Sequence, residues 1–398
     1  MEQLFQRLDD LYHEMVDIRR HLHQNPELSF KEVKTPKFIA EYHRKLNHDV
    51  RMGVGGRGVV AKLYGAKPGP TIALRADFDA LPIQEQNDVP YKSKIEGVMH
   101  ACGHDGHTAE LLVLAKVLNS LKDELAGTIV FIHQHAEEMQ PGGAIAMIED
   151  GCLEGVDVIF GAHLLAPLSY GTIGYHSGPF MSATDRFSIT LQGKGGHGGL
   201  PHHTKDTVVS ASQLVLNLQQ IVSRRVAPLE AAVLSIGNFV AHNAFNVIAD
   251  TAQIDGTVRT FSEDVQLLIK SEMERIIKGT CMAADIDADF KYFHGYPTVV
   301  NHETETCFLS DIAKDVIGVR HVLEIPPEMR GEDFAYYLQC VKGTFFYVGA
   351  GNGDEATSYP HHHPKFNIEE KAMLIAAKTF GKAVFAYSER YNQSTRLV

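Results

Sequence analysis

The stretch from Val98 to Glu110 carries one cysteine, three histidines and an aspartate in a predicted loop and the start of the following helix. Thiolate and imidazole groups are ligands that zinc and similar divalent metals accept. Cys102 and His104 are two residues apart, so an extended loop directs both side chains to the same side. The alternative interpretation is a helix N-terminus that contains a buried free thiol, which is a common place for cysteine.

Further candidate ligands follow predicted strands or stand near the C-terminus. They are Glu137, Glu138, His163 and the triplet His361–His363. With Cys102 and His104 they exceed the four ligands of one tetrahedral ion, so they indicate two ions. A thiolate can bridge two ions, and one of two adjacent glutamates can remain free to move protons. Each group alone is a weak signal, and only their combination predicts a metal centre.

The first part of the chain alternates short apolar runs with amphipathic segments. We expect helices at 4–23, 33–46, 108–118 and 143–151, and strands at 58–64, 71–75, 128–134 and 156–161. Such alternation is typical of an α/β fold, a mainly parallel sheet covered by helices. Asp77 and Asp79 follow the strand at 71–75 on the same side, and sites in such sheets lie at the carboxyl ends of strands.

The pattern changes near residue 181. A strand (185–192), a glycine-rich turn, a helix (206–224), two strands (231–240 and 247–260), a helix (262–279) and a strand (287–293) follow in order. This β-α-β-β-α-β order predicts a ferredoxin-like α+β unit. We therefore expect a discontinuous catalytic domain, residues 1–180 and 296–398, with an inserted domain at 181–295.

Composition excludes several classes of protein. The chain of 398 residues has a net charge of -12, which argues against nucleic-acid or anionic-membrane partners, since both need clustered lysine and arginine. Five cysteines at irregular spacing suit a reducing compartment better than a disulfide framework. The N-terminal segment has no signal-peptide pattern, and no apolar run reaches the length of a membrane span. A cytoplasmic enzyme is the expectation.

The sequence resembles the M20 metallopeptidases, in particular the branch of aminoacylases, hippurate hydrolases and plant auxin-conjugate hydrolases. The resemblance extends over nearly the whole chain, and its segments occur in the same order. The matching segments are Arg19–Glu27, Leu74–Pro82, Met99–His107, Ala136–Glu138 with Gly142–Ala144, Gly193–His197, Phe245–Ile248, Gly256–Thr260, Glu332–Phe334 and His362–Phe366. The resemblance implies a zinc-exopeptidase-like catalytic domain and an inserted lid and dimerisation domain. It also implies a homodimer formed through that insert.

Residue roles are implied by the same resemblance. The metal ligands would be Cys102 as the bridge, His104, Glu138, His163 and His362. The implied cofactors are two divalent ions per subunit, Mn²⁺ or Zn²⁺, with Co²⁺ or Ni²⁺ as alternatives.

The remaining roles concern catalysis and substrate binding. Glu137 would be the general base, and Asp79 would hold a ligand in orientation. His197 would reach a neighbouring subunit's site and stabilise the oxyanion, and Asn246 and Arg259 would hold the substrate carboxylate.

The implied reaction is hydrolysis of the amide bond of a small-molecule N-acyl-L-amino acid to a carboxylate and a free amino acid. Two alternatives stay open: a dinuclear-metal dipeptidase or aminopeptidase, and a homologue that binds ligands without catalysis. A one-metal structural site would leave some of the ligands unused.

Three positions depart from the family pattern, and none of them removes a ligand or the base. His135 replaces a proline before Ala136, Ala249 replaces a proline after Ile248, and Arg330 replaces a small or apolar residue. Arg330 could favour a second acidic group in the substrate, because guanidinium pairs bidentately with carboxylate. A surface salt bridge is the alternative for Arg330.

Overall fold

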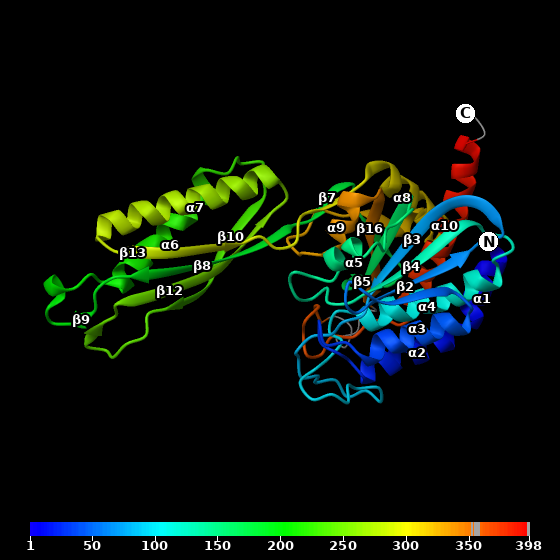
Figure 1. Cartoon of the computed structure of the whole chain (residues 1–398), viewed down its shortest axis with the longest axis horizontal. Helices are drawn as coiled ribbons and strands as arrows, with labels where there is room; N and C mark the ends of the chain where they lie inside the picture. Colours follow the sequence, from blue (N-terminus) through cyan, green and yellow to red (C-terminus); the bar gives the residue numbers. More distant parts are fainter. Residues whose placement is uncertain (352, 354–358, 396–398) are drawn as a thin grey trace. The chain divides into compact units, whose positions relative to one another are not determined.

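The computed structural model describes residues 1–351, 353 and 359–395. The chain divides into two compact units (Figure 1). The larger comprises Met1–Gly178, Val299–Pro326 and Asp333–Val398, and the smaller comprises Pro179–Thr298 and Pro327–Glu332. The sequence predicted that the inserted domain begins after residue 180 and ends before residue 296. It did not predict that the short segment 327–332 belongs to the smaller unit.

An eight-stranded sheet forms the larger unit. Its strands are β1 (Asp49–Val54), β2 (Gly58–Tyr64), β3 (Lys67–Asp77), β4 (Ala126–Gln134), β5 (Val158–Ser169), β6 (Ile173–Tyr175), β15 (Val322–Glu324) and β16 (Gly343–Gly351). They lie in the order β1-β2-β4-β3-β5-β16-β6-β15. The central strands β4, β3, β5 and β16 are parallel to one another, which confirms the predicted α/β class.

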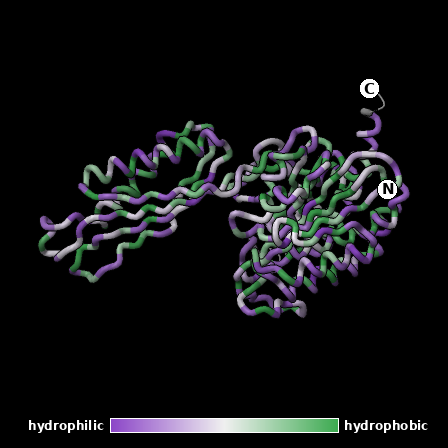
Figure 2. Tube along the Cα trace, viewed as in Figure 1, coloured by the Kyte–Doolittle hydropathy of each residue, from purple (hydrophilic) through white to green (hydrophobic). Residues whose placement is uncertain are grey.

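Helices cover both faces of this sheet. They are α1 (Glu2–Asp10), α2 (Tyr12–Gln24), α3 (Lys34–Lys45), α4 (His104–Ser120), α5 (Ala144–Glu149), α8 (Glu303–Ile317), α9 (Phe334–Cys340) and α10 (Ala372–Thr395), with a short 3₁₀ helix η2 (Val319–His321). Neighbouring residues of β16 point to opposite faces: Phe345 contacts Phe334 of α9, and Phe346 contacts Phe380 of α10. In Figure 2 the hydrophobic residues gather along the strands between these layers.

Three local expectations differ from the structure. The single helix expected at 4–23 is two helices, because Leu11 leaves the helical conformation at φ -98° and ψ 8°. Strand β1 was not expected, and its mostly exposed residues explain why no apolar run marked it. Strand β5 continues to Ser169, so His163 lies within a strand and not after its end.

The smaller unit is a four-stranded antiparallel sheet with two helices. Its elements are β8 (Ala183–Gln192), α6 (Thr207–Arg224), β10 (Ala232–Val240), β12 (Thr251–Thr260), α7 (Glu263–Ala284) and β13 (Asp287–Phe293). The sheet order β10-β12-β8-β13 is that of the ferredoxin-like fold. Side chains of Asp206 and Ser262 cap the two helices, as these residue types favour.

Several short elements complete the chain. They are β7 (Gly178–Met181), β9 (Gly196–His197), the 3₁₀ helix η1 (Pro201–His203), β11 (Val247–Ile248) and β14 (Val299–Asn301). Strands β9 and β11 pair as a small ribbon that carries the glycine-rich turn of the smaller unit. Among the described residues, no helix has both the length and the apolar character that crossing a membrane requires.

Candidate metal centre and active site

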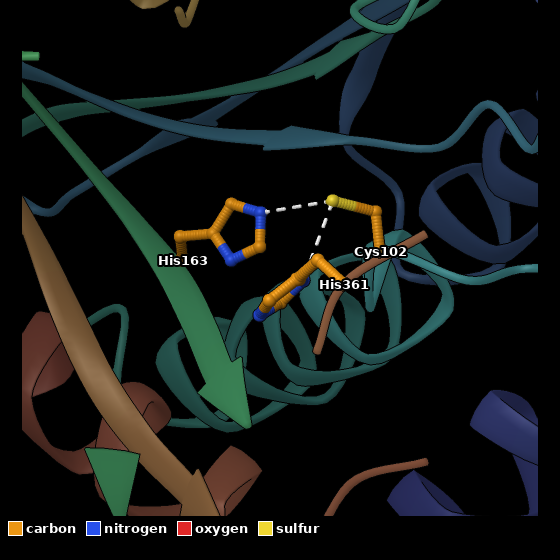
Figure 3. A group of neighbouring side chains, drawn as sticks. All are labelled: Cys102, His163 and His361. Atoms are coloured by element: carbon orange, nitrogen blue, oxygen red, sulfur yellow. Dashed lines mark hydrogen bonds between the residues drawn. The ribbon is translucent and has the colours of Figure 1, made fainter. Parts of the chain in front are cut away.

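Cys102 lies at the centre of the candidate ligands of the larger unit. Two sets of donor atoms, each within 4.8 Å of one another, share its sulfur: one is Cys102, His163 and His361, and the other is Cys102, His104 and Glu138. Gly103, at the start of α4, has a positive φ of 94° and turns the chain between Cys102 and His104. Figure 3 shows the first set, with His163 and His361 both directed at the sulfur.

The hydrogen-bond partners of two histidines leave one ring nitrogen of each available as a ligand. His163 donates from Nδ1 to the carbonyl of Leu164 at 3.1 Å, so its Nε2, 3.4 Å from the Cys102 sulfur, carries no proton. His104 donates from Nδ1 to Asp79, whose carbonyl and Oδ1 lie 3.0 and 3.2 Å away. Metal-bound histidines are typically oriented by such partners.

Two buried atoms of the second set lack a hydrogen-bond partner among the described residues. They are Nε2 of His104 and Oε1 of Glu138, and they lie 3.9 Å apart. Metal bonds of about 2.0–2.2 Å to nitrogen and carboxylate oxygen span a gap of this kind. A thiolate, imidazole nitrogens and a carboxylate therefore fit divalent metal ions.

The histidines of the C-terminal triplet differ in what they contact. The backbone N–H of Ala166 donates to Nε2 of His361, so the ring proton of His361 is on Nδ1, 3.5 Å from the Cys102 sulfur. In this arrangement His361 is a hydrogen-bond donor to the sulfur. Nε2 of His362 lies 3.2 Å from Oε2 of Glu138. His363 accepts a hydrogen bond from the backbone N–H of Lys365 and stacks on Tyr359, away from both sets.

Electrostatics in this pocket favour a bound cation. Burial lowers the pKa of His104, but the carboxylates of Asp77, Asp79 and Glu138 outweigh burial and raise it to about 10. Burial, and then the charges of Glu138 and Glu137, raise the pKa of the Cys102 thiol well above its usual range. A thiol in such a negative field becomes a thiolate when a metal cation replaces its proton.

His107 has no free nitrogen for a metal. Its Nδ1 donates to Oδ1 of Asp77 at 2.7 Å, and its Nε2 accepts the backbone N–H of Leu164 at 2.9 Å. Asp77, His104 and His107 also form a cluster of potential donors. The two hydrogen bonds of His107, however, make it a link between β3 and the residue after His163.

Asp333 is a buried residue of this site whose role sequence reasoning missed. It accepts hydrogen bonds from Arg75, at 3.0 Å, from Gln134 and from the backbone N–H of Ala144. It thereby fixes both ends of the loop between β4 and α5, which contains Glu137. The only sequence signal was its place within the Glu332–Phe334 segment of the family resemblance, which did not reveal these partners.

Glu137 and Glu138 occupy adjacent positions with different surroundings. Asp79 accepts the backbone N–H of Glu138 at 3.0 Å, in addition to its bond with His104. Burial raises the pKa of Asp79, but the hydrogen bonds from His104, Ser29 and Glu138 outweigh it and lower the pKa. Asp79 is thus an anionic anchor between two candidate ligands. Glu137 is also buried and directly precedes one of them.

Two of the predicted residues of the smaller unit share the ribbon of β9 and β11. His197 pairs with Val247, and the backbone N–H of Gly198 donates to the carbonyl of Asn246 at 2.8 Å. The N–H of Gly199 donates to Nδ1 of His197 at 3.0 Å, so the ring proton is on Nε2. His197 and Asn246 are both exposed, and His197 offers an N–H donor to the exterior of its unit.

The other two predicted residues lie elsewhere in the smaller unit. Arg259 is opposite Thr184, at the far end of β8 from the strand end that leads to His197. Eight residues of strand separate the two ends, roughly 26 Å at about 3.3 Å per residue. The structure therefore does not bring Arg259 together with His197 within one insert. Arg330 forms an ion pair with Glu328, at 3.2 Å, and its side chain is 42% exposed.

The fold and the site define an α/β protein with a buried cysteine, histidine and carboxylate cluster of the kind that divalent metals bind. The sequence matches the peptidase family M20/M25/M40 over residues 73–386. The chain belongs to this family and is a hydrolase of amide bonds.

Individual relatives agree with this assignment. The YhaA protein of Bacillus subtilis (strain 168), which is named as an amidohydrolase, is 55% identical over 388 residues and covers 98% of each chain. An N-acyl-L-amino acid amidohydrolase of Geobacillus stearothermophilus is 47% identical over 76% of this chain and 82% of that protein. The crystal structure of the YXEP protein of Bacillus subtilis, described as a dinuclear metal-binding peptidase of the M20 family, has a TM-score of 0.81, 36% identity, and coverage of 96% and 99%.

The shared sulfur of Cys102 leads to a prediction for metal binding. We expect Cys102→Ser to weaken both of two divalent-ion binding events by at least tenfold, because the sulfur belongs to both donor sets, whereas His104→Ala weakens only one. Calorimetric titration of chelator-treated protein with Zn²⁺ or Mn²⁺ measures this. His363→Ala is the matched control and should bind like the wild type. Unchanged binding by Cys102→Ser would contradict the assignment.

Proposed function

We propose that the protein is a metal-dependent amidohydrolase that cleaves N-acyl-L-amino acids to a carboxylate and a free amino acid. The observation that carries the proposal is the cluster of Cys102, His104, Glu138 and His163, directly beside the buried Glu137. The name of the Geobacillus relative supports the substrate class. Cys102, His104, Glu138, His163 and His362 would hold two divalent ions, of which Mn²⁺ or Zn²⁺ is the first candidate.

The residues of the chain divide the work of the reaction. The ions, when bound, lower the pKa of a water molecule to near neutrality and polarise the substrate carbonyl. Glu137 accepts the proton of the attacking water and delivers it to the departing nitrogen. Asp79 keeps His104 and the backbone of Glu138 in place by the hydrogen bonds described above.

The smaller unit would supply substrate contacts in a homodimer. In this proposal Nε2–H of His197 stabilises the oxyanion, and Asn246 and Arg259 bind the carboxylate of the substrate. His197 and Arg259 lie at opposite ends of the same insert, too far apart for one insert to present both to a substrate the size of an acylated amino acid. The separation supports a site that takes Arg259 from one subunit and His197 from its partner.

The reaction class is tested with chelator-stripped protein reconstituted separately with Mn²⁺, Zn²⁺, Co²⁺ and Ni²⁺. N-acetyl and N-benzoyl amino acids should be hydrolysed only after metal is restored. We expect Glu137→Gln to keep both ions and lose roughly 10²- to 10⁴-fold in kcat, as the loss of a general base does. The exposed Glu149→Gln is the control. Preference for dipeptides with a free amine would indicate a peptidase, and metal binding without turnover would indicate a non-catalytic homologue.

Mixed dimers test the contribution of His197 across subunits. Glu137→Gln and His197→Ala chains, carrying different tags, are co-expressed and the hybrid is purified on both tags. If His197 acts in the partner's site, the hybrid has one complete site and should recover about half of the wild-type activity, although each parent is nearly inactive. A hybrid as inactive as its parents would place His197 in the site of its own chain.

Arg330 is proposed to favour substrates with a second acidic group. We expect Arg330→Ser to lower kcat/KM for N-acetylglutamate relative to N-acetylalanine by on the order of tenfold, the loss of one charge-assisted hydrogen bond. Arg320→Ser, which removes another exposed arginine, is the control. An unchanged ratio would leave Arg330 as the surface ion pair with Glu328.

A further inference from the structure

The segment that carries Glu137 and Glu138 begins with a residue in an unfavourable backbone conformation. Ala136 is fully buried and has a positive φ of 54°. The left-handed region is disfavoured for alanine, because its Cβ approaches the carbonyl oxygen, and glycine avoids this cost. Such residues persist at functional sites only where their surroundings hold them in place. A contact with the backbone of Ala136 is therefore expected to hold this conformation.

Glu32 provides that contact. Oε1 of Glu32 accepts the backbone N–H of Ala136 at 3.0 Å, across 104 residues of sequence. Glu32 is fully buried, in the loop between α2 and α3, and its Oε2 has no hydrogen-bond partner among the described residues. A buried carboxylate is costly unless it is hydrogen-bonded, so the bond from the Ala136 N–H is a specific feature of the structure.

The same loop also holds the other end of the segment. Ser29 donates from Oγ to Oδ2 of Asp79 at 2.6 Å, and the same Oδ2 accepts the backbone N–H of Glu138 at 3.0 Å. The loop 29–32 thus contacts Ala136 directly and Glu138 through Asp79. Glu137 lies between these two fixed backbone groups.

Two other charged groups act on Glu32. Nε of Arg57 lies 3.9 Å from Oε2, and the charge of Asp79 also acts on the carboxylate. His135, which precedes Ala136, contacts Phe30 of the same loop, with ring centroids 5.9 Å apart. Burial first, and the charge of Asp79 in addition, raise the pKa of Glu32 to about 7. The oxygen that accepts the Ala136 N–H does so in either protonation state, since the proton can occupy Oε2.

We propose that Glu32 is a positioning residue for the general base: its bond to the Ala136 N–H keeps that residue left-handed and so holds Glu137 at its working position. The inference rests on the proposed role of Glu137 in amide hydrolysis. It assigns no ligand or proton-transfer role to Glu32, which acts through the backbone. His135, where relatives of the branch are expected to have proline, contacts Phe30 of the same loop.

The test is a double-mutant cycle between Glu32→Ala and Ala136→Gly. We expect Glu32→Ala to lower kcat by about 10- to 100-fold, with KM and two-ion binding within about threefold, because Asp79 still holds Glu138. Ala136→Gly alone should stay within about threefold of the wild type. The double variant should recover about 5- to 30-fold of the lost kcat. Glycine has little of the free-energy cost that alanine has in the left-handed conformation, and that cost corresponds to about a 5- to 30-fold change in population. Glu32→Gln, whose amide oxygen can accept the same N–H, should keep most of the activity.

Glu27→Ala is the matched control, since that carboxylate in the same loop caps the backbone N–H groups of residues 33–35 and should alter stability without altering kcat. Should Glu32→Ala fail to fold, Glu32→Asp, one methylene shorter, replaces it in the cycle. Wild-type kcat in Glu32→Ala, or no recovery in the double variant, would overturn the inference. Absence of hydrolysis by the metal-loaded wild type would instead refute the proposed function.

Discussion

The buried carboxylate of Asp79 is the interaction on which the candidate centre depends. It accepts a hydrogen bond from His104, one from Ser29 and one from the backbone of Glu138, and so joins three segments distant in sequence. A buried charge is tolerated only when such bonds replace its hydration. The free-energy cost of desolvating this aspartate is offset by these hydrogen bonds. They also hold the groups around it, including two candidate ligands, in a rigid arrangement.

The histidines of the larger unit show how hydrogen-bond partners separate similar side chains. His104 and His163 each donate from Nδ1 to a backbone carbonyl, which directs Nε2 into the cluster. His107 and His361 instead accept a backbone N–H at Nε2, so neither presents that nitrogen to a metal. The chemistry of each ring therefore follows from the backbone group that lies beside it, more than from its nearness to the sulfur.

Much of this arrangement could be predicted from the sequence. The alternation of strands and helices indicated the α/β class, and the carboxyl ends of β3 and β4 indicated where Asp79 and Glu138 would meet the loop of Cys102. Long-range contacts could not be predicted: Glu32 and Ala136 are 104 residues apart. Three consecutive histidines also give the same local signal, whereas in the structure the N–H of Ala166 lies beside His361 and the carboxylate of Glu138 lies beside His362.

The place of β16 in the sheet has a consequence for synthesis of the protein on the ribosome. This strand, from the last sixth of the chain, lies between β5 and β6, so the apolar edge of β5 has no partner until residues 343–351 have emerged. Most of the smaller unit, a continuous segment, emerges earlier and has its own core. The nascent larger unit therefore exposes a strand edge prone to association. Premature termination before β16 would yield an aggregation-prone fragment, even though that fragment already contains most of the candidate metal ligands.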